Sequence, residues 1–284
     1  MLPSADLLAP GLKLILGTLA FVWILWTVRN VSPRAVGMML TFPALNGVVL
    51  LTVTDKLVSE IVIGIFPLML FNGFLPALFI ALRRRLGGRE WLAIGLCLVI
   101  WSLLAAVLEW RAVWTYRWAL ALAAGLLILA SAGWAFGRLR ETGLPLPLQG
   151  EHRETLADFA ADRALRVLLF FVSLLIVSLV AYAWPDAHSL VGRLSALPLV
   201  PLFVLHWAVN ARQADLAELR LAALIGPVAA SGFLFLFSYT LGFIRSDAGV
   251  LHSAYWAIGL AALLVEWELT RLAIIGMARL TYSR

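Results

Sequence analysis

Three ionisable residues lie close together in an otherwise apolar stretch near the end of the chain: Glu266, Glu268 and Arg271. A charged side chain at membrane depth costs several kcal/mol unless it is paired or hydrated, so its presence requires a reason. Glu268 and Arg271 are three residues apart and can pair on one helix. Two interpretations stay open for this group: an internal salt bridge near the cytoplasmic interface, or a role in coupling transport to a proton or cation.

Other polar residues in apolar stretches could bind a substrate or ion, or act as an acid or base. Glu109 interrupts an apolar run, and His206 shares a helix face with Asn210, four residues later. A lone buried histidine is more often a satisfied core residue than a ligand or proton relay. The same choice, between binding and hydrogen bonding to a neighbouring helix, applies to Asn46, Asn72 and Ser231.

Pro43 and Pro198 lie partway through apolar stretches. Proline inside a helix removes an amide donor and frees a carbonyl one turn back. Irregular backbone at membrane depth is tolerated only where protein or a water-lined cavity surrounds it. The two prolines therefore predict a pair of broken helices around a central site, with simple kinks as the alternative.

Sequence signatures of hydrolysis, nucleotide binding and metal binding are absent. The single cysteine, Cys97, can form neither an intrachain disulfide nor a thiolate metal site. We therefore expect no cofactor and no metal, and an enzyme is less favoured than a non-catalytic protein. The net charge of +6 comes from basic residues at helix ends, which argues against nucleic acid as a partner.

The elements that position these residues are transmembrane helices. Of 284 residues, 63% are hydrophobic and 13% are charged, and the apolar runs are continuous. Because a helix crosses the bilayer core with about 20 apolar residues, the sequence predicts an all-α, polytopic transmembrane bundle. Nine spans are expected near residues 11–28, 36–54, 61–82, 91–109, 115–136, 166–184, 190–209, 221–241 and 251–272. The fourth and fifth could instead form a re-entrant pair.

The basic residues predict the orientation of these spans. Fifteen arginines, among them Arg34, Arg138 and Arg279, fall in loops on one side, and six basic residues, among them Arg117 and Arg193, fall on the other. The positive-inside rule places the larger group in the cytoplasm. We expect a periplasmic N-terminus and a cytoplasmic C-terminus.

The chain also shows internal similarity. Val36-Gly37 precedes Pro43 as Val191-Gly192 precedes Pro198, Asn72-Gly73-Phe74-Leu75 matches Ser231-Gly232-Phe233-Leu234, and Leu108-Glu109-Trp110 matches Val265-Glu266-Trp267. The matches occur in the same order, which predicts four-helix repeats at 1–112 and 166–284. A linking helix at 113–137 and a cytoplasmic loop with a surface helix at 138–165 would separate them. An odd number of crossings between equivalent helices makes this an inverted 4+1+4 repeat, as in many secondary transporters.

The second half has a further pattern. Gly192 and Pro198 are followed by His206, a short polar turn, and the run Ala-Glu-Leu-Arg-Leu-Ala from Ala217 to Ala222. This resembles the small GlpM-type bacterial inner-membrane proteins, over roughly residues 166 to 245 and less closely over 11 to 82. Known members are single four-helix units associated with envelope polysaccharide production. The resemblance implies a bacterial inner-membrane setting, although this chain is twice their size.

The favoured function is an inverted-repeat transporter or flippase for a small or lipid-linked metabolite. One alternative is a non-catalytic membrane subunit of a cell-envelope assembly or secretion complex. Another is an intramembrane lipid-modifying enzyme that uses Glu109, His206 or Glu266 as acid or base. The expected partners are membrane lipid and either proteins of an envelope complex or further copies of the chain.

Overall fold

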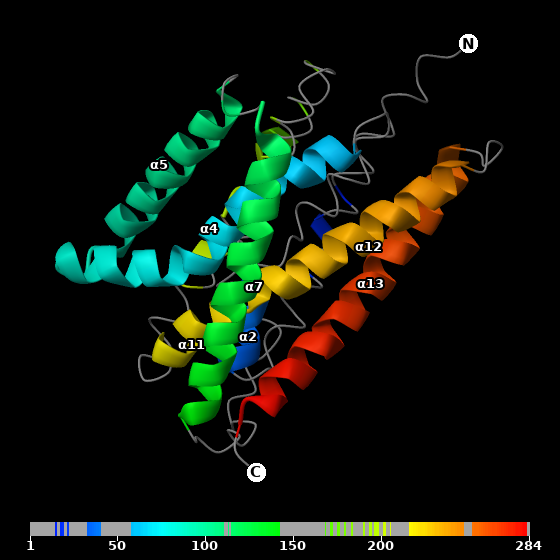
Figure 1. Cartoon of the computed structure of the whole chain (residues 1–284). Coiled ribbons are helices and arrows are strands. Elements are labelled where there is room, and N and C mark those ends of the chain that lie inside the picture. The colour runs from blue at the N-terminus through cyan, green and yellow to red at the C-terminus, as the bar shows by residue number, and fades with distance from the viewer. Residues whose placement is uncertain are drawn as a thin grey trace.

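The computed structural model describes residues 33–40, 58–110, 115–142, 196–198, 216–246 and 252–282, with isolated positions at 15–22, 113 and 168–205. In these ranges every regular element is a helix (Figure 1). The helices are α2 (Pro33–Met39), α4 (Val58–Arg85), α5 (Glu90–Glu109), α7 (Arg117–Glu141), α11 (Leu216–Ala223), α12 (Gly226–Ser246) and α13 (His252–Leu280). The all-α prediction is confirmed for this part of the chain.

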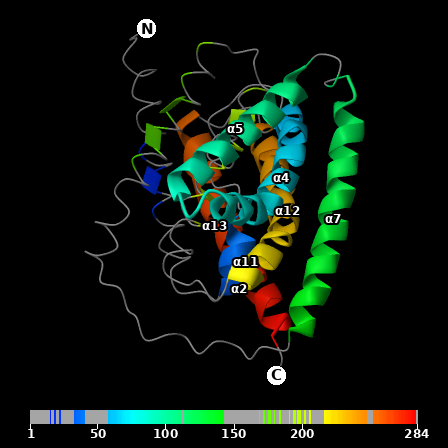
Figure 2. The ribbon, with the colours of Figure 1, turned by 90° about the vertical axis from the view of Figure 1, so that its left-hand side faces the viewer.

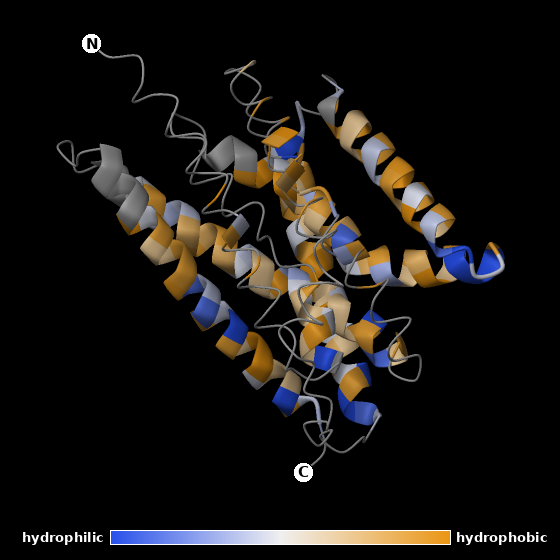
Figure 3. Cartoon of the chain, turned by 180° about the vertical axis from the view of Figure 1, so that it is seen from behind, coloured by the Kyte–Doolittle hydropathy of each residue, from blue (hydrophilic) through white to orange (hydrophobic). Residues whose placement is uncertain are grey.

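Four stretches of the described residues are long and apolar enough to cross a membrane: Val62–Arg85, Glu90–Leu108, Arg117–Glu141 and Leu216–Gly242. Only 28% of the apolar stretch of α5 and 22% of that of α7 is buried inside the protein. Their outer faces present large apolar side chains such as Trp91, Leu103, Leu122 and Leu129, and Figure 3 shows hydrophobic residues along α5. A surface of this kind matches lipid, so the fold is that of a membrane-embedded bundle.

The predicted spans agree with the structure in part. Those at 61–82, 91–109, 115–136 and 221–241 correspond to α4, α5, α7 and α12. The fourth and fifth are two separate helices, α5 and α7, and each is long and apolar enough to cross a membrane. The predicted spans at 11–28, 36–54, 166–184 and 190–209 lie largely outside the described residues, and the count of nine stays a prediction.

The last predicted span, 251–272, is the longer helix α13, which continues to Leu280. It is not among the four apolar stretches, and it carries Glu266, Glu268 and Arg271 along its length. Figure 3 shows hydrophilic positions partway along this helix, between hydrophobic ones. α13 packs against α12 and runs beside it, so it lies at the same depth in the bundle (Figure 1).

α4 changes direction partway, and its last turns run across the bundle (Figure 1). Pro67 and Pro76 lie inside it, and proline is the usual cause of such a bend. The helix ends at two glycines with positive φ, where the Gly88 amide donates to the Arg83 carbonyl at 2.9 Å. Arg83 then pairs with Glu90 in the first turn of α5. These local interactions form the α4–α5 hairpin.

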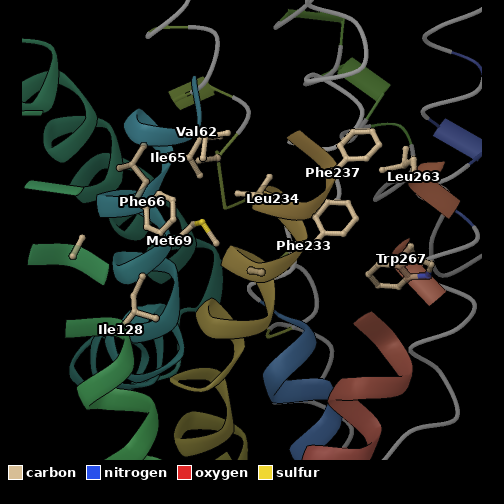
Figure 4. Packing of buried hydrophobic residues seen from close by; sticks show 14 of the residues in the cluster. Val62, Ile65, Phe66, Met69, Ile128, Phe233, Leu234, Phe237, Leu263 and Trp267 are labelled. Carbon is tan, nitrogen blue, oxygen red and sulfur yellow. The ribbon is translucent and has the colours of Figure 1, made fainter. Parts of the chain in front are cut away.

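The core lies where α4, α12 and α13 meet. Figure 4 shows Phe66 and Met69 of α4 near Leu234 of α12, while Phe237 of α12 lies toward Leu263 and Trp267 of α13. α7 covers the other side of α4 and stands at the edge of the bundle (Figure 2). It packs inward through a stripe of mostly small residues, Ala124, Ile128, Ala132, Ala135 and Leu139, because small side chains allow close contact between membrane helices.

α2 and α11 approach each other closely at Gly37, which the sequence singled out only as part of a repeat motif. α2 packs against α11, and a Cβ atom on Gly37 would lie 2.6 Å from the Leu219 carbonyl oxygen and 2.8 Å from the Ala222 Cβ. The Leu219 carbonyl belongs to the helix backbone, so it cannot move aside as a flexible side chain could. Position 37 therefore requires glycine for packing.

We expect Gly37→Ala to lower the free energy of unfolding by about 1–3 kcal/mol, because the two helices must move apart. The matched control is Gly232→Ala on α12, where a Cβ would have no atom within 4 Å. Alanine's better helix propensity should leave that variant as stable as the parent or more so. Thermal unfolding of the purified protein in detergent measures both, and equal stability of the two variants would contradict the packing role.

Candidate functional site

Pro198 lies in a helix break, as its position in the sequence predicts. Arg193 and Leu194 are helical, Ala196 to Pro198 form a turn, and Pro201 and Leu202 are helical again. The Ala196 and Leu197 amides donate to carbonyls three residues back, at 2.8 and 3.2 Å, and the Leu202 amide donates to the Pro198 carbonyl at 3.1 Å. One helical segment therefore ends in a tight turn, and another begins at the proline.

Asn72 of α4 lies against this break. Its side-chain amide donates to the Ala196 carbonyl at 3.2 Å, and the residue is only 7% exposed. Its Oδ1 atom is buried, with no hydrogen-bond donor among the described residues. The next residue, Gly73, fits closely against Pro227, since a Cβ there would lie 2.9 Å from the proline Cγ. The middle of α4 thus supplies a donor to the interrupted helix and keeps one buried acceptor.

Glu266 forms a second polar point in the core, between α13 and α12. The side chain is 6% exposed, and the Thr240 hydroxyl of α12 lies 2.7 Å from its Oε1 atom. Its Oε2 atom is buried, with no donor among the described residues. Because α13 runs from His252 to Leu280, Glu266 lies midway along the helix.

The salt bridge predicted within α13 is present. Arg271 Nε donates to Glu268 Oε2 at 2.7 Å, and both side chains are partly exposed. Glu266 forms no ion pair with any described residue, so the three ionisable residues divide into a pair and a separate carboxyl group. Ser231, the match of Asn72 in the predicted repeat, donates to the Pro227 carbonyl of its own helix at 2.7 Å.

The most connected polar side chain of the described residues, Arg34 of α2, was not among the predicted site residues. Fully buried, it bonds to the Glu218 carboxylate of α11 at 2.8 Å and to the Thr142 hydroxyl after α7 at 2.8 Å. It also donates to the backbone carbonyl and hydroxyl of Thr281 after α13, and its guanidinium lies over the Tyr282 ring. In the sequence Arg34 is one of many loop arginines, so composition alone offers no signal for this cluster.

A narrow cleft lies on α4 beside α5 and α7. Arg117 and Arg193 line it together with Ile63, Gly64, Pro67, Leu108 and Leu120. Pro67 has no amide to offer the Ile63 carbonyl, so this carbonyl lacks its usual helical partner. The space is on the scale of a single water molecule, which is too small for an organic substrate in this conformation.

Three predicted site residues, Pro43, Asn46 and His206, lie outside the described residues, as does the side chain of Glu109. A pairing of Glu109 with His206 in an intramembrane enzyme is therefore untested. Within the described part, no group of three or more His, Cys, Asp or Glu side chains could hold a metal ion. Comparison with protein-family models, curated proteins and solved structures finds no match for the chain.

We expect Arg34→Ala to destabilise the protein by about 3–5 kcal/mol, because Glu218 loses its partner in a buried setting. The control is Arg138→Ala, which removes a pair with Glu141 whose side chains are 58% and 66% exposed and should cost no more than about 1 kcal/mol. Arg34→Lys should fall between them, since lysine keeps the charge but not the planar fork. Thermal unfolding in detergent ranks the three variants. Equal effects of the two alanine variants would contradict a stabilising role for the contacts of Arg34.

Proposed function

We propose that the chain is a transporter or flippase for a small molecule or a lipid-linked metabolite. The observation that carries this is the interrupted helix at residues 196–198, bonded by Asn72 from the middle of α4. Interrupted helices near the bilayer midplane form the substrate and ion sites of many secondary transporters. Here the break lies inside the bundle, with Ala196 and Pro198 buried, and not at a lipid-facing kink.

The proposal includes the inverted repeat, which helix order and direction support. α4 and α5 form one hairpin and α12 and α13 another, and α4 and α12 run in opposite directions (Figures 1 and 2). The contacts of the matched residues differ, because Gly73 packs against Pro227 whereas Gly232 faces open space. The argument for duplication therefore rests on the arrangement of whole helices.

We also propose that the side carrying Arg34 is cytoplasmic and that the chain resides in a bacterial inner membrane, the setting implied by its likeness to GlpM-type proteins. The start of α2 and the ends of α7 and α13 meet at Arg34. Arg117 and Arg193 share a different cleft. This separation of Arg34 from Arg117 and Arg193 is what the positive-inside count expects, and it supports the proposed orientation.

A second candidate function is a non-catalytic subunit of an envelope complex. The observation that favours it is the filled interior: one buried cluster joins α4, α7, α12 and α13, and the cleft beside Arg193 has room for little more than water. A transporter with this interior would need its helices to move before it could admit a substrate. A subunit would not.

The transporter proposal predicts that Asn72→Leu lowers flux at least about fivefold, the effect of losing one buried hydrogen bond of about 1–3 kcal/mol. Ser231→Ala is the matched control, because its hydroxyl bonds only within α12 among the described residues. Proteoliposomes would be assayed with a fluorescent phospholipid for flipping and with labelled sugars and amino acids for uptake. No flux from the parent, together with a stoichiometric partner on purification, would favour the subunit.

The proposed orientation predicts opposite labelling of the two ends of α7. In a Cys97→Ala background, Tyr116→Cys should react with an impermeant maleimide on intact cells, and Arg140→Cys only after permeabilisation. Both positions are exposed, and the native Cys97 is buried in α5. Reaction of both positions from one side would show that α7 does not span the membrane, and the reverse pattern would invert the topology.

A further inference from the structure

Glu266 is a carboxyl group held in an apolar part of the bundle. Phe237 and Leu241 of α12 and Leu263 and Trp267 of α13 belong to the same buried cluster, and Figure 4 shows Phe237, Leu263 and Trp267 lining the interface between these helices. Burying an ionised carboxylate in such surroundings is costly, and a neutral carboxylic acid avoids most of that cost. The protonation state of Glu266 is therefore decided by its hydrogen bonds and by nearby charges.

The hydrogen bonds fit the protonated acid. Thr240 has one hydroxyl proton and two acceptors, Glu266 Oε1 at 2.7 Å and the Leu236 carbonyl at 3.1 Å. An ionised Glu266 would accept a hydrogen bond from that hydroxyl proton. The Leu236 carbonyl would then lose the threonine's hydrogen bond, and Oε2 would have no described donor. A proton on Oε1 would instead be donated to Thr240 Oγ1, and the threonine would donate its own proton to Leu236. Oε2 is then a neutral carbonyl oxygen, for which the lack of a donor costs less than it would for a carboxylate.

No described charge opposes this assignment. On α13, Glu268 and Arg271 pair with each other. On α12, the ionisable side chain that the structure describes is Tyr239, which is 76% exposed. α2 also packs against α13, but its Arg34 is bound to Glu218 and to groups beyond the ends of α7 and α13.

A bound metal cation explains the site less well than a proton does. Mg²⁺ and Ca²⁺ each take six or more oxygen ligands. The described oxygens hydrogen-bonded in one chain with the Glu266 carboxyl group are the Thr240 hydroxyl and the Leu236 carbonyl. Such a set suits one shared proton better than a coordination shell.

We propose that Glu266 is a proton-binding site in the middle of the bundle, and that its proton is the coupling ion of transport. The second clause rests on the transporter function proposed above. The acid accepts one proton from water on one side of the membrane and releases it on the other. Release occurs when α12 and α13 move apart and water reaches the carboxyl group. Thr240 holds the protonated form by accepting its hydrogen bond.

Infrared spectroscopy of the purified full-length protein in detergent tests proton binding directly. At neutral pH the parent should show the carbonyl stretch of a buried carboxylic acid, Glu266→Gln should lack it, and Glu268→Gln should keep it. Glutamine can donate to Thr240 as the acid does, so the variant is expected to fold. A band that survives in Glu266→Gln, or one that sodium ions abolish at fixed pH, would overturn the proton site.

Flux measurements separate the site from its role in transport. In proteoliposomes with an entrapped pH dye and an imposed potassium gradient with valinomycin, Glu266→Gln should reduce proton entry at least tenfold, about 1.4 kcal/mol in the barrier. Glu268→Gln should stay near the parent. If the parent shows the infrared band but carries neither protons nor any tested solute, the transporter proposal fails and the proton-binding site stands. If the parent moves protons and Glu266→Gln moves them equally well, the coupling role fails.

Discussion

Inside a bilayer a polar group can find a partner only within the protein or in trapped water, and the described core of this chain is arranged around that constraint. Pro198 interrupts a helix, and Asn72 bonds a carbonyl at the interruption. Glu266 brings a carboxyl group into the same core, and Thr240 meets it from the adjacent helix. Each of these hydrogen bonds links two segments of the described bundle and gives a polar group a partner away from lipid.

Packing in this bundle depends on small residues as much as on large ones. The lipid-facing surfaces of α5 and α7 are as apolar as their buried faces, so hydrophobicity alone cannot orient them. Close approach does so instead: α7 turns Ala124, Ala132 and Ala135 inward, and Gly37 brings α2 onto α11. Van der Waals contact favours these orientations because lipid cannot follow the helix surface as closely.

The polar contacts of this bundle differ in how many bonds hold them, and this difference bears on function. The Arg34 cluster ties the ends of four segments together through charged and neutral bonds, and breaking it would cost several kcal/mol. The contact between Glu266 and Thr240 is a single hydrogen bond that protonation can rearrange. The ends of these four segments are therefore joined by several polar bonds, whereas this polar link between α12 and α13 is a single one.

The sequence by itself determined whatever depends on neighbours within a turn or two of helix: the membrane helices, the Glu268–Arg271 pair at a spacing of three, and the break at Pro198. Helical geometry relates spacing directly to position, so these features follow from residue order. Only the tertiary structure decided that Asn72 meets Ala196, that Thr240 meets Glu266, and that Arg34 gathers Glu218, Thr142 and Thr281. Arg34 and Thr281 are 247 positions apart, and spacing along the chain says nothing about such pairs because helix packing alone brings them together.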